Sequence, residues 1–184
     1  MSKDIKDVNG IVEKAPNVVS FVAKSGTGKT TLIEKIIKIL SKKGYRVSSI
    51  KHTDHDFDAD IPGKDSWRHK NAGAYSTMIL SGSKMAFFSD IDSSLKIIDM
   101  IPKYFRGSDI VIIEGFKDID IRKIELFRKE LNPDLKLRFG NDSNLLLICS
   151  DEFIDGIKTP QININNAQEI ADYIECNIIS RVDS

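Results

Sequence analysis

Residues 23–30 constrain this chain more than any other segment, because they read Ala-Lys-Ser-Gly-Thr-Gly-Lys-Thr between two apolar patterns of different period. Residues 18–22 before them are apolar except for Ser20 and include three valines, which is typical of a buried strand. Apolar residues after them recur at helical spacing up to Gly44, a residue suited to the turn that follows a helix. A strand, a glycine loop and a helix in this order is the context of a phosphate-binding P-loop.

The residue types of this loop predict a specific chemistry. Gly26 and Gly28 allow the backbone to turn so that successive N–H groups point at a phosphate. Lys29 can reach the β- and γ-phosphates, and the Thr30 hydroxyl can hold Mg²⁺. We therefore predict that the chain binds a nucleoside triphosphate together with Mg²⁺. The loop residues expected to bind it are Ser25, Gly26, Thr27, Gly28, Lys29, Thr30 and Thr31.

Length and composition narrow the class of protein. The 184 residues suit one domain, expected over residues 16–184, after a leader expected to be disordered over residues 1–15. The 27 basic and 27 acidic residues cancel, so the overall charge favours neither nucleic acid nor an anionic membrane as a partner. Two cysteines far apart and a charged beginning without a long apolar stretch indicate a reduced, cytoplasmic protein.

The remaining periodicities predict an α/β fold of the P-loop NTPase class. We expect a mostly parallel central sheet with helices on both faces and an antiparallel β-hairpin added to it. Strands are predicted at residues 45–50, 109–113, 124–128, 145–149 and 161–164, helices at 64–72, 93–105 and 166–179, and the hairpin at 75–88.

Two acidic positions are candidate Mg²⁺ ligands. Glu114 ends an apolar strand, where a Walker B acid can hold the metal and orient an attacking water, so Lys29 and Glu114 are the candidate catalytic residues. A polar cluster after the strand at 45–50 supplies the other, Asp56, expected to face the loop across neighbouring strands. This cluster also fits a transition-metal site or a plain polar loop, although Mg²⁺ is favoured; it contains His52, Asp54, His55 and Asp56.

Two basic groups leave their role open. The first contains Lys64, Arg68, His69 and Lys70, and the second Lys117, Arg122 and Lys123. Each group could bind the phosphate or pyrophosphate of a second ligand, or could be a solvated face.

Six blocks of the chain resemble the adaptor family of molybdopterin-guanine dinucleotide biosynthesis known as protein B. They are residues 23–30; Lys51-His52-Thr53 with His55-Asp56-Phe57; Pro62-Gly63-Lys64-Asp65-Ser66 with Arg68-His69; Ala72-Gly73-Ala74; Glu114-Gly115-Phe116-Lys117; and Lys123-Ile124-Glu125 with Arg128. Position 54 is Asp where the family usually has His, which leaves Asp56 as the better metal candidate.

The resemblance implies a homodimeric GTP-binding protein with at most slow, Mg²⁺-dependent GTPase activity. Its implied partners are the molybdenum cofactor guanylyltransferase and molybdopterin or molybdopterin-guanine dinucleotide, with Lys64 and Arg68 as candidate contacts to the cofactor. The alternatives are a stand-alone P-loop enzyme, either a small-molecule kinase or an ATP-dependent carboxylate-activating synthetase, and a metallochaperone GTPase that uses His52 and His55.

Overall fold

A computed structural model describes residues 5–6, 12–13, 15–53, 55–58, 60–92, 94–134 and 136–179. They form two compact units. The first contains the described residues before Thr53 and those from Met100 onward, and the second contains those of Thr53–Asp99. Asp54 and most of the predicted leader lie outside the described residues.

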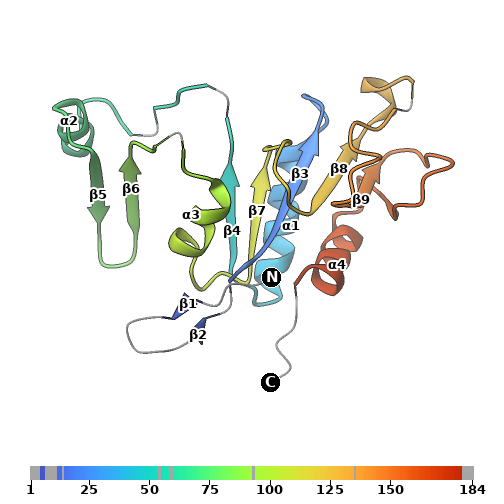
Figure 1. The fold of residues 1–184 in the computed structure, drawn as a ribbon, viewed down its shortest axis with the longest axis horizontal. Coiled ribbons are helices and arrows are strands. Elements are labelled where there is room, and N and C mark those ends of the chain that lie inside the picture. The colour runs from blue at the N-terminus through green and yellow to red at the C-terminus, as the bar shows by residue number, and fades with distance from the viewer. Residues whose placement is uncertain are drawn as a thin grey trace. The chain divides into compact units, whose positions relative to one another are not determined.

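The first unit is built on one parallel sheet. Its strands, in spatial order, are β10 (Gln161–Asn163), β9 (Leu145–Ser150), β8 (Lys123–Phe127), β3 (Asn17–Ala23), β7 (Ile110–Glu114) and β4 (Val47–Lys51). Every pair of neighbouring strands is parallel, so their carboxyl ends share one edge of the sheet (Figure 1). This confirms the mostly parallel α/β fold and places the loop strand β3 in the middle of the sheet.

One face of this sheet packs against α1 (Lys29–Lys42) and α4 (Ala167–Asn177). Apolar residues of both helices and of alternate strand positions form the main core; they include Val19, Phe21, Leu32, Ile36, Leu40, Ile112, Ile170 and Ile174. Helix α1 ends close to the predicted place, because Gly44 has a φ of 93° that other residues rarely adopt.

The segments that follow β8 and β9 cover the opposite face. A smaller core forms there from Phe127, Leu145, Ile148 and Ile154, with Leu137, Phe139 and Ile157 packed against it. Because side chains alternate along a strand, Phe127 shares this face with Lys123 and Glu125, whereas Ile124 and Leu126 point into the main core. Two charged residues of β8 therefore lie inside the protein.

The second unit contains α2 (Asp65–Asn71), β5 (Ser76–Leu80) and β6 (Met85–Ser89). As predicted, β5 and β6 pair as an antiparallel hairpin, but they form a two-stranded sheet of their own and do not add to the parallel sheet. None of the described residues of 53–99 is buried. This unit therefore has no hydrophobic core of its own among those residues.

Two further elements differ from the expected bounds. Helix α3 (Ile97–Tyr104) begins later than predicted, because Asp92 accepts from the N–H groups of Ser94 and Leu95 and closes a local turn instead. Strands β1 (Ile5–Lys6) and β2 (Val12–Glu13) pair inside the leader. Disorder of the leader as a whole stays a prediction.

Candidate nucleotide-binding site

The loop between β3 and α1 has the backbone that the glycines predict. Gly26 and Gly28 have φ values of 83° and 90°. Thr27 between them is buried, and its hydroxyl donates to the carbonyl oxygen of Lys24 at 2.7 Å, which holds the loop closed on itself. The two glycines and this hydrogen bond within the loop therefore fix the loop conformation.

The first turn of α1 is open to an anion. Its N-cap is Gly28, no side chain caps it, and the turn contains no acidic residue. The first N–H groups of a helix have no partner within the helix, and they carry the positive end of its dipole. A phosphate is the natural acceptor for such a helix start after a glycine loop.

Glu114 is the polar centre of this site. It is the last residue of β7, paired in register with Phe21 of β3 on one side and Lys51 of β4 on the other. Its Oε1 accepts from the Thr30 hydroxyl at 2.7 Å and from the Lys51 ammonium at 2.5 Å. The structure thus brings the predicted Walker B carboxylate to the loop threonine.

The charges around Glu114 are mutually coupled. Burial opposes ionisation of Glu114, but hydrogen bonds from Lys51 and Thr30 outweigh it and hold the pKa of this carboxyl below its usual value. Burial lowers the pKa of Lys29, and the nearby ammonium groups of Lys51 and Lys117 lower it further against the attraction of Glu114. Lys29 and Lys51 both act on the Glu114 carboxylate, and Lys117 adds a third positive charge near Lys29, an excess of positive charge that suits a polyphosphate.

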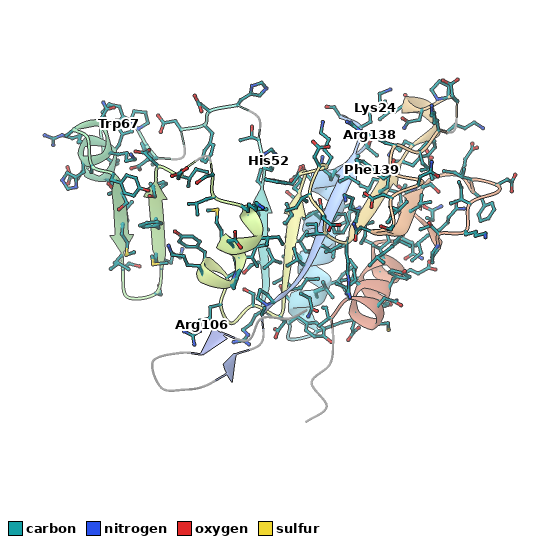
Figure 2. All side chains as sticks on the ribbon, in the orientation of Figure 1. Lys24, His52, Trp67, Arg106, Arg138 and Phe139 are labelled. Carbon is teal, nitrogen blue, oxygen red and sulfur yellow. The ribbon has the colours of Figure 1, made fainter. Side chains whose placement is uncertain are left out.

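The turn after Glu114 is tight and orders His52. Gly115 and Phe116 both have positive φ, 95° and 60°, and the Gly115 N–H donates to the Phe21 carbonyl oxygen at 3.1 Å. This conformation places the Phe116 ring edge-on to His52, with ring centroids 4.1 Å apart. His52, labelled in Figure 2, is thereby packed at the end of β4.

Arg128 joins the loop to the far strands of the sheet. Its Nε donates to the Thr27 carbonyl oxygen at 3.0 Å, and its Nη2 donates to Asn165 Oδ1 at 3.3 Å. Sequence reasoning assigned no role to Arg128 or to Lys51. The only signal for either was membership of a family block, because partners 101 and 63 residues away leave no local pattern.

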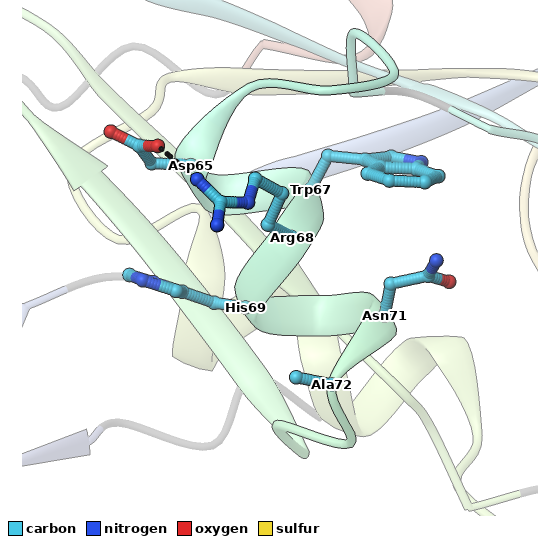
Figure 3. A pocket seen from close by; sticks show the side chains of 6 residues that line it. All are labelled: Asp65, Trp67, Arg68, His69, Asn71 and Ala72. Carbon is cyan, nitrogen blue, oxygen red and sulfur yellow. Dashed lines mark ion pairs between the residues drawn. The ribbon is translucent and has the colours of Figure 1, made fainter.

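The second unit holds the other predicted site residues. Asp56, Lys64 and Arg68 are all exposed. Arg68 forms an ion pair with Asp65 at 3.5 Å and lines a surface hollow of about 520 Å³ on α2 (Figure 3). Strand β4, which precedes Asp56, does not adjoin the loop strand β3 as expected, because β7 lies between them.

Lys123 fits neither of the roles left open for it. Its side chain is 3% exposed, and its Nζ donates to Asp142 Oδ2 at 2.8 Å and to the Ile119 carbonyl oxygen at 2.7 Å. It is a buried structural cation. Among the residues that the structure describes, no group of three or more His, Cys, Asp or Glu side chains could hold a metal ion.

A parallel sheet whose central strand leads through this loop into an uncapped helix, with a carboxylate beside the loop threonine, defines the P-loop NTPase class. Within that class the sequence is decisive: the family described as molybdopterin guanine dinucleotide synthesis protein B matches residues 18–151. The chain belongs to this family.

Similar proteins agree with this assignment. The molybdopterin-guanine dinucleotide biosynthesis adapter protein of Escherichia coli is 33% identical over 160 residues, which are 85% of this chain and 90% of that protein. The protein of the same description from Haemophilus influenzae is 35% identical over 82% of this chain and 83% of that protein.

Solved structures share the fold. A crystal structure of molybdopterin-guanine biosynthesis protein B has a TM-score of 0.69 at 27% identity and covers 86% of this chain and 97% of that chain. A Bacillus subtilis structure of the same family has a TM-score of 0.71 at 23% identity, over 90% of this chain and 99% of that chain. In the described part of this chain, no helix has the length and apolar character needed to cross a membrane.

Proposed function

We propose that this protein is a GTP-binding adapter of molybdopterin-guanine dinucleotide biosynthesis that assists the molybdenum cofactor guanylyltransferase in the cytoplasm. The observation that carries the proposal is the match of residues 18–151 to the family, because this range contains the whole loop, Lys51 and Glu114. The names of the relatives support the pathway, and the local charge supports a polyphosphate ligand.

Different residues of the loop and of β7 would bind GTP and Mg²⁺. The N–H groups of residues 25–31 cradle the phosphates, and Lys29 supplies a point charge to them. Thr30 and Glu114 fit Mg²⁺, because a hydroxyl and a carboxylate 2.7 Å apart are the hard oxygen donors it prefers. Bound there, Mg²⁺ would neutralise phosphate charge, and Glu114 would orient a water for slow hydrolysis.

The first experiment is calorimetric titration of the purified protein with GTP and with ATP, each with Mg²⁺ and with EDTA. We expect Lys29→Ala to raise the GTP dissociation constant roughly ten- to a hundredfold or more, because the loss of one charge-assisted contact alone has about this effect. Lys38→Ala, an exposed change on the same helix, is the matched control. A folded Lys29→Ala protein with normal GTP affinity would remove the central claim.

Turnover assays on the same purified protein, with and without the guanylyltransferase, distinguish an adapter from a stand-alone enzyme. An adapter turns GTP over slowly, and its effect appears as faster guanylylated cofactor formation by the guanylyltransferase. Rapid phosphoryl transfer from ATP to a small molecule without any partner would instead establish the kinase or synthetase alternative.

Arg68 and Lys64 are proposed to bind the phosphate or pyrophosphate of the pterin cofactor, or a partner surface, and not GTP. The Arg68–Asp65 pair lies on the surface, with side chains 69% and 87% exposed, so it is worth little and can be exchanged for a phosphate. We expect Arg68→Ala to spare GTP binding and to slow guanylylated cofactor formation roughly tenfold, the worth of one such contact. Lys84→Ala, another exposed cation of the second unit, is the control. Normal cofactor formation by Arg68→Ala would return this segment to a solvated helix.

Asp56 is proposed to complete the Mg²⁺ environment, which the exposure of this carboxylate permits. Asp56→Asn should then resemble Glu114→Gln in its effect on Mg²⁺-dependent binding. If Asp54→Asn weakens Mg²⁺-dependent binding and Asp56→Asn does not, then Asp54 and not Asp56 is the metal ligand.

A further inference from the structure

A cavity of about 310 Å³ opens beside the start of the loop, within the first unit. Its lining includes Lys24, Glu125, Asn132, Lys136, Arg138 and Phe139. Figure 2 labels Lys24, Arg138 and Phe139, which lie toward the carboxyl ends of β3 and β8. The volume is within the range of small-ligand pockets. Neither the fold nor the P-loop chemistry accounts for this cavity.

The unusual group in the cavity is the Glu125 carboxylate. Glu125 is 5% exposed, and no Lys or Arg among the described residues forms an ion pair with it. Burial raises its pKa against the opposing backbone hydrogen bonds of Arg138 and Phe139 and the charge of Arg138. Burying a carboxylate that has no direct ion pair costs free energy, so a functional reason for Glu125 in the wall of this cavity is worth seeking.

Each oxygen of the Glu125 carboxylate accepts one backbone hydrogen bond, which leaves part of its acceptor capacity for a ligand. Oε1 accepts from the Arg138 N–H at 2.8 Å, and Oε2 accepts from the Phe139 N–H at 3.1 Å. Each oxygen of an ionised carboxylate has two lone-pair sites, so one site remains on each oxygen. Two adjacent lone pairs of this kind accept two parallel N–H donors, as in bidentate recognition.

The rest of the lining adds an apolar wall and a cationic rim. Phe139 supplies an aromatic ring, whereas Lys24, Lys136 and Arg138 are exposed cations. Arg138 lies 5.7 Å from the Phe139 ring centroid, so cation and ring are close together. These features together suit a planar ligand that carries a phosphate group. Paired N–H donors at one edge of its ring would meet Glu125, the ring would lie against Phe139, and the phosphate would meet the cations.

We infer that this cavity binds a 2-amino-4-oxopyrimidine ring, with Glu125 accepting from its ring N–H and its amino group and with the rim cations holding an attached phosphate. Guanine and pterin share this ring edge, whereas adenine lacks it. The inference rests on the proposed function, because GTP and a pterin cofactor are the ligands that bring such a ring to this protein.

The test uses the full chain and two probes: 6-hydroxymethylpterin pyrophosphate, followed by pterin fluorescence, and Mg–GTP, with Mg–ATP as the ring control. Glu125→Gln should weaken binding of the ring probe by at least roughly tenfold, because it replaces an acceptor with a donor. Lys136→Ala with Arg138→Ala should weaken it severalfold. That double variant keeps the backbone N–H groups that hold Glu125, so it guards against a folding defect. Lys158→Ala, a change to an exposed lysine outside the cavity lining, is the control.

The two sources of the ring give different results. Pterin binding that survives saturating GTP and Lys29→Ala assigns the cavity to a pterin beside the nucleotide. Competition between the probes, with GTP but not ATP weakened by the variants, assigns it to guanine. Wild-type affinity for both probes in both variants would overturn the inference and leave Glu125 as a structural anchor for residues 138–139. The proposed function fails on a separate result, namely GTP binding that does not depend on Lys29.

Discussion

At the scale of single residues, Glu114 and Lys51 set the electrostatics of the nucleotide site. The Lys51 ammonium occupies the same carboxylate oxygen, Oε1, that accepts from Thr30. Mg²⁺ bound between Thr30 and Glu114 would compete with this ammonium. Lys51 is 63% exposed, so its side chain has room to leave the carboxylate. We expect it to turn toward phosphate when the metal binds.

The corresponding prediction concerns Glu114→Gln. The amide keeps the size of the side chain but removes the charge that attracts Mg²⁺, so the gain in GTP affinity on adding Mg²⁺ should fall roughly tenfold. Binding in EDTA should change much less. The measurement is the ratio of GTP dissociation constants with Mg²⁺ and with EDTA. Glu34→Gln, an exposed change on α1, is the control, and an unaltered ratio in Glu114→Gln would exclude this residue as a metal ligand.

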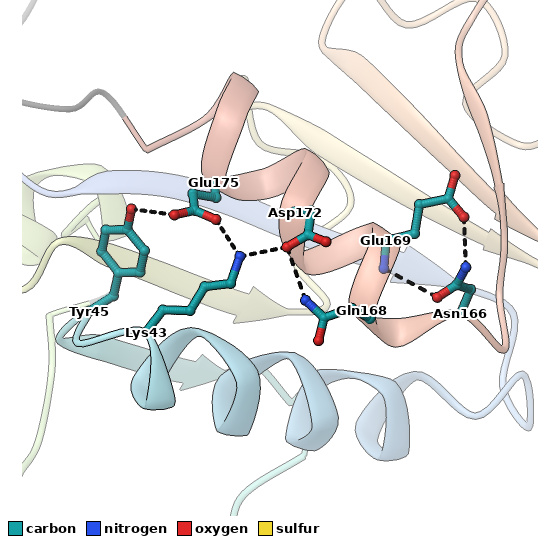
Figure 4. Close-up of polar contacts among 7 residues, drawn as sticks. All are labelled: Lys43, Tyr45, Asn166, Gln168, Glu169, Asp172 and Glu175. Carbon is teal, nitrogen blue, oxygen red and sulfur yellow. Dashed lines mark hydrogen bonds and ion pairs between the residues drawn. The ribbon is translucent and has the colours of Figure 1, made fainter.

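At the scale of elements, α1 and α4 are tied together at one end by a polar cluster (Figure 4). Lys43, just after α1, donates to Asp172 Oδ1 at 2.5 Å and to Glu175 of α4. The Tyr45 hydroxyl donates to the other oxygen of Glu175 at 2.9 Å. These bonds connect the helix that begins at the loop to the helix that closes the fold.

This cluster makes stability depend on pH. The hydrogen bond from Lys43 holds the pKa of Asp172 below its usual value, against the effect of desolvation. A carboxylate whose folded pKa is lowered stabilises the protein above its unfolded pKa, about 3.9, and loses this contribution as the pH falls through the folded value. The bonds to Asp172 and Glu175 raise the pKa of Lys43, so its contribution is lost only in strong alkali.

We therefore predict that Lys43→Met lowers the free energy of unfolding at pH 7. The difference from wild type should stay constant down to about pH 5 and shrink below about pH 4, as Asp172 becomes protonated. Urea unfolding at a series of pH values measures it. Lys42→Met, the neighbouring exposed lysine, should show no such pH dependence; equal behaviour of the two variants would contradict the role of the cluster.

At the scale of the whole molecule, the second unit bears a large apolar surface. Met78 pairs with Phe87 and Leu80 with Met85 across the hairpin, so all four side chains share one face. Their exposed fractions are 50%, 41%, 69% and 65%. An apolar face of this kind typically marks an interaction site. Because the family resemblance implies a homodimer, we propose that this face contacts a second copy of the chain.

The prediction is that Met78→Lys with Leu80→Lys converts a dimer into a monomer. Two buried charges would cost more than the contact provides, whereas in a monomer they are merely solvated. Light scattering after size exclusion gives the mass. Ser83→Lys, at the exposed turn of the same hairpin, should leave the dimer intact. A dimer that persists in the double variant would place the interface elsewhere.

Local pattern was sufficient to predict most elements and part of the site. The loop backbone follows from Gly26 and Gly28, because glycine adopts positive φ values that other residues adopt rarely, and Gly44 and Gly73 follow helices for the same reason. Glu114 at the end of an apolar strand predicted the carboxylate that meets Thr30, because parallel strands present their carboxyl ends at one edge. The loop backbone, the helix ends and the strand that ends at Glu114 each depend on residues a few positions apart, so the sequence predicts them directly.

The tertiary structure alone decided which distant residues meet. The strand order puts β7 between β3 and β4, so Lys51 reaches Glu114; it also puts β8 beside β3, so Arg128 reaches the Thr27 carbonyl oxygen. Periodicity gives the face of a strand but neither its neighbours nor the loop that covers it. For that reason Lys123, with the same charge as its solvated neighbours in sequence, is buried against Asp142, and Glu125 lines a cavity. The local sequence thus determined the conformation of the phosphate-binding loop. The ion-pair and hydrogen-bond partners of the charged residues depend instead on the order in which the strands assemble into the sheet.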